Sequence, residues 1–263
     1  MQQSPLKAQG HKPLWPASKL TNLPAYDPAF THADIDLADI ANSLSETTSG
    51  RLCLYGPPGT GKSAYGQWIA QQIDRPLLVK RASDLLGKYV GETERNLAQA
   101  FREAEYEGAV LLIDEVDSFL QNRESATRSW EVSQVNEFLT QLEVFDGVFI
   151  ATTNLMGQLD AAAMRRFDLK IKFDYLRPDQ STMLLQRHCQ NLTTAKSGGL
   201  QITPQTVQRV RQLHNLTPGD FAAVSRQSRL CPLNSADAFV SALEAECALK
   251  PGVHSPTIGF LAA

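Results

Sequence analysis

The sequence is poor in cysteine and has no long apolar run. Its four cysteines, Cys53, Cys189, Cys231 and Cys247, form no C-x-x-C pair or other metal-ligand spacing, which predicts reduced, structural thiols. No apolar run approaches the ~20 residues of a membrane-spanning helix, and residues 1–10 contain no apolar segment of a secretory signal. These absences argue against a secreted, fibrous or membrane protein, and we expect a cytoplasmic one.

The chain also has no marked excess of charge of one sign. It contains 25 Lys and Arg against 28 Asp and Glu, which gives a net charge of −3. This balance argues against a broad basic surface for duplex DNA, although not against a small local groove. With 263 residues and a hydrophobic share of 43%, the chain is expected to form one medium-sized domain, or a domain with a small lid.

Residues 1–32 are predicted to be an arm or linker, because five prolines interrupt them and their apolar residues show no period. Residues 33–175 alternate short apolar runs with helical stretches, which predicts a parallel α/β sheet. Four expected strands are nearly continuous apolar runs, typical of strands covered on both faces, whereas the fifth alternates and fits an edge. In chain order the expected strands are Leu52–Tyr55, Leu77–Lys80, Val110–Asp114, Val148–Thr152 and Leu169–Phe173.

Residues 176–250 show only helical spacing. Val207, Val210 and Leu213 recur at the helical period, and so do Phe239 and Leu243. This pattern predicts a small all-α lid subdomain. Residues 251–263 are punctuated by Pro and Gly and are expected to form an extended tail.

Residues Gly56–Ser63 match the phosphate-binding pattern G-x-x-x-x-G-K-[ST] in full. The match lies between the expected strand Leu52–Tyr55 and an expected helix, Lys62–Ile73, as the motif requires. Backbone N–H groups of such a loop cradle phosphate oxygens, Lys62 reaches the β- and γ-phosphates, and Ser63 can ligate Mg²⁺. A Gly/Pro turn that fits by chance is the alternative. The predicted ATP or ADP contacts are Pro57, Pro58, Gly59, Thr60, Gly61, Lys62, Ser63 and Ala64.

Two carboxylates end the expected strand Val110–Asp114. Four apolar residues deliver Asp114 to the carboxyl edge of the sheet, where it would hold Mg²⁺, and Glu115 follows as a general base for an attacking water. A solvated strand end is the alternative. Asp117 is either a further acidic element of the site or a surface residue.

At these residues the chain resembles the AAA+ ATPases, and within them the AAA group that includes katanin, spastin and the ATPase module of FtsH. The resemblance covers residues 33 to 249 and implies a P-loop NTPase of three αβα layers followed by a helical lid. It implies that Asn154, after the expected strand Val148–Thr152, is the sensor that orients the attacking water. An Asn in a strand-end turn is the alternative.

The segment Leu159–Asp168 resembles the family's second region of homology, where arginines reach into the neighbouring subunit's nucleotide site. Arg165 and Arg166 are adjacent here, whereas many relatives have Pro-Gly between the two, so either one can be the arginine finger. A solvated Arg pair at a helix end is the alternative.

The segment Asp84–Glu94 resembles the loop that lines the central pore of the family's hexamers. The resemblance implies that Lys88 and Tyr89 grip an unfolded polypeptide, a task that suits an aromatic ring because it packs on any side chain. An exposed Tyr in a Gly-flanked loop is the alternative. Ser125–Glu131, with Trp130, occupies the second pore-loop position.

In the helical part, His188 and Gly219 fall where the family's lid meets the adenine. Gly219 permits close approach of the backbone to a flat ring. A histidine packed inside the lid is the alternative for His188.

The resemblance implies an Mg²⁺-dependent ATPase that hydrolyses ATP to ADP and phosphate within a homo-oligomer, namely a hexamer. Hydrolysis would be coupled to the remodelling, unfolding or disassembly of a protein substrate, reached directly or through an adaptor. One alternative is an AAA+ motor that handles nucleic acid, which the acidic balance disfavours. The other is an ATP-dependent assembly scaffold with little turnover, which the presence of Glu115, Asn154 and Arg166 disfavours.

Overall fold

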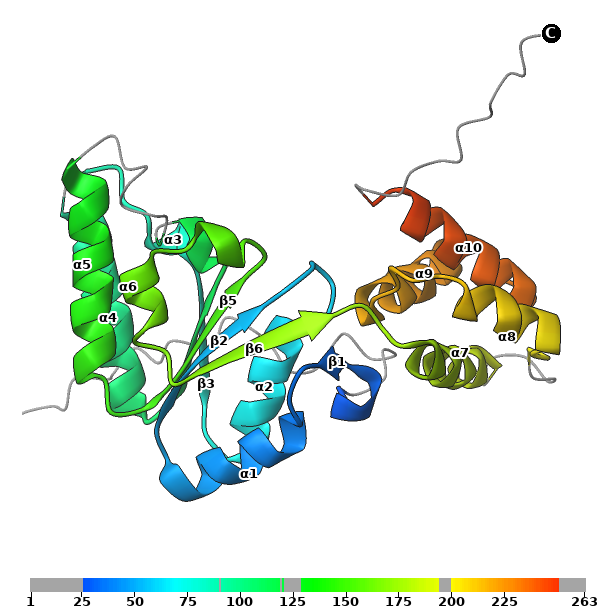
Figure 1. Cartoon of the computed structure of the whole chain (residues 1–263), viewed down its shortest axis with the longest axis horizontal. Helices are drawn as coiled ribbons and strands as arrows, with labels where there is room; N and C mark the ends of the chain where they lie inside the picture. The colour runs from blue at the N-terminus through cyan, green and yellow to red at the C-terminus, as the bar shows by residue number, and fades with distance from the viewer. Residues whose placement is uncertain (1–25, 90, 119, 121–128, 194–199, 251–263) are drawn as a thin grey trace, which may run out of the picture.

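The computed structural model describes residues 26–89, 91–118, 120, 129–193 and 200–250. These form an α/β sheet followed by a bundle of helices, which confirms the predicted fold class. Figure 1 shows the helical bundle beyond the carboxyl end of β6, beside the sheet rather than on one of its faces. Within the described residues, no helix has both the length and the apolar character that a membrane span requires.

The sheet has the order β1-β6-β2-β5-β4-β3. All neighbouring pairs are parallel except β1 with β6. Because β2 lies beside β5 and β5 beside β4, the three strands that end in the predicted motifs are neighbours. The strands are β1 (His32–Ala33), β2 (Gly50–Tyr55), β3 (Leu77–Arg81), β4 (Val110–Asp114), β5 (Val148–Thr153) and β6 (Leu169–Asp174).

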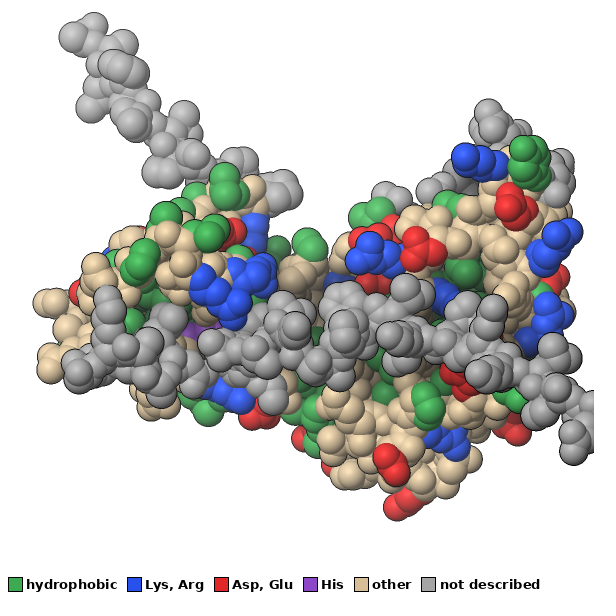
Figure 2. All heavy atoms as spheres, turned by 180° about the vertical axis from the view of Figure 1, so that it is seen from behind, with side chains coloured by type: hydrophobic (Ala, Val, Ile, Leu, Met, Phe, Trp, Pro, Cys, Tyr) green, Lys and Arg blue, Asp and Glu red, His purple; other side chains and the backbone are tan. Residues whose placement is uncertain are grey.

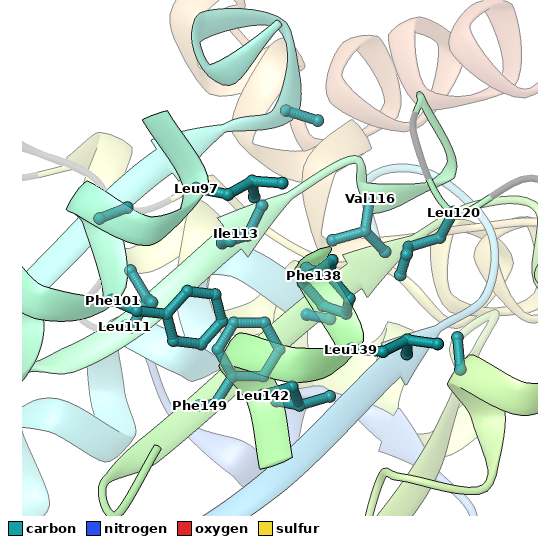
Figure 3. Packing of buried hydrophobic residues seen from close by; sticks show 14 of the residues in the cluster. Leu97, Phe101, Leu111, Ile113, Val116, Leu120, Phe138, Leu139, Leu142 and Phe149 are labelled. Carbon is teal, nitrogen blue, oxygen red and sulfur yellow. The ribbon is translucent and has the colours of Figure 1, made fainter. Parts of the chain in front are cut away.

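Helices cover both faces of the sheet and each face has its own apolar core. On one face lie α1 (Leu37–Thr47) and α2 (Lys62–Gln72). On the other lie α3 (Ala82–Leu85), α4 (Glu92–Glu107), α5 (Ser129–Val144) and α6 (Ala161–Met164). In Figure 3, Phe101 of α4 and Phe138 of α5 pack with Phe149 of β5, and their ring centroids lie 5.4 and 5.7 Å from that of Phe149.

The two edges of the sheet differ from the sequence-based prediction. Leu169–Phe173 was expected to fit an edge, but β6 lies between β2 and the two-residue strand β1. It alternates because Ile171 and Phe173 enter the core while Lys170 and Lys172 are exposed. The edges are instead β1 and β3. β3 was expected to be covered on both faces, but Val79 in it is 51% exposed.

The lid consists of α7 (Pro178–Thr193), α8 (Pro204–Arg211), α9 (Pro218–Leu230) and α10 (Ala236–Ala248). Local signals set where these helices begin. Thr217 and Asp220 form a reciprocal capping box at α9, and the Ser235 side chain accepts from the Ala238 N–H at α10. The expected helical faces are buried at Val210, Phe239 and Leu243, and together they make the lid's own core.

Part of the predicted arm packs against the folded chain. Tyr26 lies beside Tyr65 and Trp68 of α2, with ring centroids 6.2 and 6.1 Å away. Ala29 and Thr31, a few residues after Tyr26, contact the lid. The Gln180 side chain donates to the Thr31 carbonyl oxygen at 3.0 Å and to the Ala29 carbonyl oxygen at 3.2 Å. Residues 26–32 therefore contact both the sheet layer and the lid. Residues 1–25 of the predicted arm and the predicted tail, 251–263, lie outside the described residues.

Candidate functional site

The predicted phosphate loop connects β2 to α2. Gly56, Gly59 and Gly61 all have positive φ angles, of 134°, 79° and 101°. At Gly56 a Cβ would lie 2.0 Å from the carbonyl oxygen of Phe173, so only glycine fits between the loop and β6. The Thr60 hydroxyl donates to the Pro57 carbonyl oxygen at 2.8 Å and closes the loop on itself. The sequence motif thus has the left-handed backbone turns that its glycines allow.

The side chain of Lys62 is buried at the first position of α2. Its ammonium donates to the carbonyl oxygens of Gly56 and Pro57 at 2.8 and 2.9 Å, and to Asn154 Oδ1 at 2.8 Å. Burial lowers the pKa of Lys62 to about 8, and the nearby carboxylates of Asp114 and Asp117 oppose that shift only in part. A buried cation is therefore aimed across the loop at the end of β5.

Two oxygen ligands suited to a hard cation meet beside Lys62. The Ser63 hydroxyl lies 3.1 Å from each carboxylate oxygen of Asp114, and the Thr152 hydroxyl also donates to Asp114. Hydroxyl and carboxylate oxygens are the donors that Mg²⁺ takes when phosphate completes its coordination. The two residues predicted for the metal are already in contact, so the donor set fits Mg²⁺.

Glu115 follows the end of β4 in an unusual backbone conformation. Its φ angle is 60°, in the left-handed region that costs a non-glycine residue about 1 kcal/mol or more. The Glu115 N–H donates to the Thr152 hydroxyl at 3.3 Å, and its carboxylate is exposed. The turn therefore separates two adjacent carboxylates: Asp114 contacts Ser63, while Glu115 is open to solvent.

Asp117 and Asn154 are tied to the same strand ends. The Thr153 hydroxyl donates to Asp117 at 2.7 Å and accepts from the Leu155 N–H at 2.9 Å. Asn154, which lies between Thr153 and Leu155, accepts from Lys62. Of the two alternatives for Asp117, its contact with Thr153 and its effect on Lys62 favour membership of the acidic site.

The lid reaches the phosphate loop through Gly219. The Gly219 N–H donates to the Gly59 carbonyl oxygen at 2.9 Å. A Cβ on Gly219 would lie 2.9 Å from Gly59 Cα, and a Cβ on Gly59 would lie 2.9 Å from the Thr217 hydroxyl oxygen. The structure therefore brings Gly219 to the phosphate loop, and both glycines are needed for this close approach.

His188 lies among the core residues of the lid. It is 5% exposed, its ring centroid lies 5.6 Å from that of Phe221, and its Nδ1 lies 2.7 Å from the Ser225 hydroxyl. Burial lowers the pKa of His188 to about 4, so the ring is neutral at pH 7. These contacts favour the packed lid histidine over the adenine contact.

The two arginines at the end of α6 have different surroundings. Arg166 forms an ion pair with Glu143 of α5 and donates to the Ala162 carbonyl oxygen at 2.9 Å. Arg165 is exposed. Among the described residues, no hydrogen bond or ion pair joins either guanidinium to the phosphate loop of the same chain, so the structure does not bring them into this site.

Lys88 and Tyr89 lie in an exposed loop with a fixed backbone. One carboxylate oxygen of Glu92 accepts from the N–H groups of both residues, at 2.8 and 3.2 Å, and the Thr93 hydroxyl accepts from the Gly87 N–H at 2.9 Å. The Tyr89 side chain is 79% exposed. The loop therefore presents a Lys and a Tyr to solvent. The second predicted pore loop lies outside the described residues up to residue 128, and beyond it the Trp130 side chain is not described.

Reasoning from the sequence gave no role to several residues that contact the site. Thr152 and Thr153 stand beside Asn154 in the sequence, but only the pairing of β5 with β4 places their hydroxyls against Asp114 and Asp117. Tyr26 lies in the predicted arm, and a Cβ on Gly61 would lie 3.5 Å from its ring. The sequence gave no periodic signal for Tyr26, an aromatic residue between prolines. The Thr-Thr pair at a strand end, in contrast, was a signal from which a role in the site could have been predicted.

Together, the sheet order, the phosphate loop on α2 and the acidic end of β4 define a P-loop nucleotide-binding module with a helical lid. The comparisons with known proteins agree. Residues 52–175 match the ATPase family associated with various cellular activities (AAA). Spastin of Drosophila erecta is 31% identical over 196 residues, which are 69% of this chain and 24% of that protein, and spastin of Drosophila persimilis gives the same figures.

A crystal structure of the FIGL-1 AAA domain in complex with ADP is also similar, with a TM-score of 0.58 and 25% identity. The match covers 79% of this chain and 73% of that one. The chain therefore contains an AAA ATPase domain and is distantly homologous to spastin and to the FIGL-1 AAA domain. It spans about a quarter of the length of the spastins that it matches.

Proposed function

We propose that this chain hydrolyses ATP to ADP and phosphate and uses the cycle to remodel protein substrates. One observation carries the first part: Lys62 contacts Asn154 while its neighbour Ser63 contacts Asp114, so the ends of three strands meet at one phosphate loop. The AAA domain match and the similarity to an ADP-bound FIGL-1 domain support nucleotide binding at this loop.

In the proposed reaction, backbone N–H groups of residues 59–63, which include the start of α2, bind the phosphates. The Lys62 ammonium exchanges its carbonyl partners for phosphate oxygens. Its electrostatic attraction to these oxygens is stronger in this buried position than it would be in water. Glu115 accepts the proton of the attacking water, and the Asn154 amide orients that water. The strained turn at Glu115 keeps its carboxylate away from Ser63, free to act as the base.

Ser63 and Asp114 would hold Mg²⁺, with Thr152 fixing the Asp114 carboxylate. The chemistry that Mg²⁺ would supply there is neutralisation of the negative charge on the phosphates.

We propose that the site is completed by a neighbouring copy of the chain in a hexameric ring. Phosphoryl transfer gains from a cation opposite the transferred group, and among the described residues neither Arg165 nor Arg166 bonds to its own phosphate loop. Arg165 is the better candidate for this contact because it is exposed, whereas Arg166 is held by Glu143. The exposed Lys88 and Tyr89 are proposed to grip the protein substrate, directly or behind an adaptor.

The test is ATP hydrolysis per subunit over a wide range of protein concentration, with Mg²⁺ present. A specific rate that climbs cooperatively supports a site completed between subunits, and Glu115→Gln should abolish turnover while ADP still binds. A rate that is substantial and independent of concentration, measured where the chain is shown to be monomeric, would contradict completion in trans.

Two other functions predict different results. A nucleic-acid motor would bind DNA or RNA in a salt-sensitive way and hydrolyse ATP faster when bound. On the face shown in Figure 2, acidic and basic side chains occur together on both lobes, in keeping with a net charge of −3. An assembly scaffold would bind ATP and turn over equally slowly with and without Glu115→Gln. The cytoplasmic location remains a prediction.

A further inference from the structure

Lys250, just after α10, joins three segments of the chain at the base of the lid. Its ammonium donates to Asp220 at 2.6 Å and to the Asn215 carbonyl oxygen at 2.5 Å. The same nitrogen lies 5.5 Å from the ring centroid of Tyr175, in the connection between β6 and α7. The Lys250 side chain is only 21% exposed, although it lies at the end of the last described helix.

Asp220, the partner of Lys250, is a nearly buried carboxylate with a structural task. Its oxygens accept from the Thr217 N–H at 2.7 Å and from the Thr217 hydroxyl at 2.9 Å, which forms the cap of α9. The side chain is 10% exposed. A carboxylate this buried is costly unless a cation and hydrogen-bond donors surround it, and Lys250 is its ion-pair partner.

Thr217, which the Asp220 carboxylate holds, and Gly219 in the same turn both contact the phosphate loop. The Thr217 hydroxyl faces Gly59, and the Gly219 N–H donates to the Gly59 carbonyl oxygen at 2.9 Å. The two segments are so closely packed that a Cβ added to either glycine would clash with the other segment. We therefore expect a change in the cap of α9 to alter the contact between the turn 217–219 and Gly59.

We propose that Lys250 is a positioning residue of the nucleotide site. By pairing with Asp220 it holds the turn 217–219 on Gly59 and sets how closely the lid covers a bound nucleotide. This role rests on the proposed ATPase function. Without the ammonium, the buried Asp220 carboxylate has no cation as a partner, and the turn 217–219 moves away from Gly59. Closure of the lid on a nucleotide then costs more free energy.

The experiment measures the Kd of a fluorescent ADP analogue. It also measures KM and kcat for ATP at a protein concentration where the rate per subunit no longer rises with concentration. Lys250→Met should raise Kd and KM on the order of tenfold, the size of a typical coupling between two sites, with less than a twofold change in kcat. Lys250→Arg should restore much of the affinity because it keeps the charge. The matched control is Lys172→Met, which removes another Lys–Asp pair, with Asp174, on an exposed side chain.

Gly219→Ala tests the same contact without touching the ion pair. It should also raise the Kd for ADP, because its Cβ would lie 2.9 Å from Gly59 Cα, whereas Gly157→Ala, whose Cβ meets nothing within 4 Å, should not. Wild-type affinity in folded Lys250→Met would overturn the role of Lys250. If that variant does not fold, wild-type affinity in Gly219→Ala overturns the proposal instead. Failure of the wild-type chain to bind ADP would overturn the proposed function, and this role with it.

Discussion

The Lys62 ammonium donates to the side-chain oxygen of Asn154 at 2.8 Å, although 92 positions separate the two residues. This bond links the phosphate loop to the end of β5, where an attacking water would be oriented. It also places an amide beside a cation whose burial has already lowered its pKa. The cation proposed to bind phosphate and the amide proposed to orient the water are therefore in direct contact.

Asn154→Ala separates binding from chemistry. Lys62 keeps two carbonyl acceptors in this variant, so the Kd for ADP should change less than threefold. The loss of the amide should lower kcat by a factor on the order of 10², as for other groups that orient or stabilise the reacting atoms. Steady-state hydrolysis and ADP titration check this, and a fall in affinity as large as the fall in kcat would contradict it.

Nucleotide affinity should depend on pH through Lys62. Burial lowers the pKa of Lys62 to about 8, and phosphate binding favours the charged form. The free protein therefore loses the proton above pH 8 while the complex retains it, so the Kd for ADP should rise by up to tenfold per pH unit there. Titrations between pH 7 and 9.5 measure this slope. Lys62→Arg, which stays charged, should flatten it, and an equal slope in both proteins would exclude Lys62 as its source.

His188 should make the lid sensitive to acid. Its pKa is about 4 in the folded chain and ~6.5 when unfolded, so the unfolded state binds the extra proton between these values. The free energy of unfolding should therefore fall by about 2 kcal/mol between pH 7 and pH 5. Urea unfolding at the two pH values measures the loss, and His188→Gln should reduce it. If the variant loses as much stability on acidification as the wild type, His188 is not responsible.

The two arginines should differ in what they support. Arg166→Ala should cost about 0.5 kcal/mol of stability, because it removes a half-exposed ion pair with Glu143, whereas Arg165→Ala should leave stability unchanged. Arg165→Ala should abolish hydrolysis. Mixing it with Glu115→Gln should restore part of the rate, because some interfaces then combine an intact Glu115 with an intact Arg165 from the neighbour. A mixture that co-assembles yet stays inactive would contradict the trans arrangement.

Tyr89→Ala should abolish the unfolding of a protein substrate while ATP hydrolysis continues. The Tyr89 side chain is 79% exposed in a loop whose backbone Glu92 holds, so its removal should leave the fold intact. Tyr106→Ala is the matched control, since Tyr106 is 92% exposed on α4. Substrate unfolding at the normal rate by Tyr89→Ala would exclude the threading role.

What the sequence determined by itself is local. The glycines of the loop Gly56–Ser63, the apolar run that ends in Asp114 and Glu115, and the Thr217 cap of α9 are each encoded within a few residues. Sterics and hydrogen bonding at that range leave one outcome, and so the α/β class, the phosphate loop and the helical lid were predictable.

The tertiary structure decided which of these pieces meet. Strand order made β3 an edge and brought the Thr152 hydroxyl to Asp114, and packing placed His188 in the lid core. The bonds from Lys62 to Asn154, from Gly219 to Gly59 and from Lys250 to Asp220 all join residues far apart in the sequence. Spacing along the chain does not encode such pairs, because they depend on how whole strands and helices pack against one another.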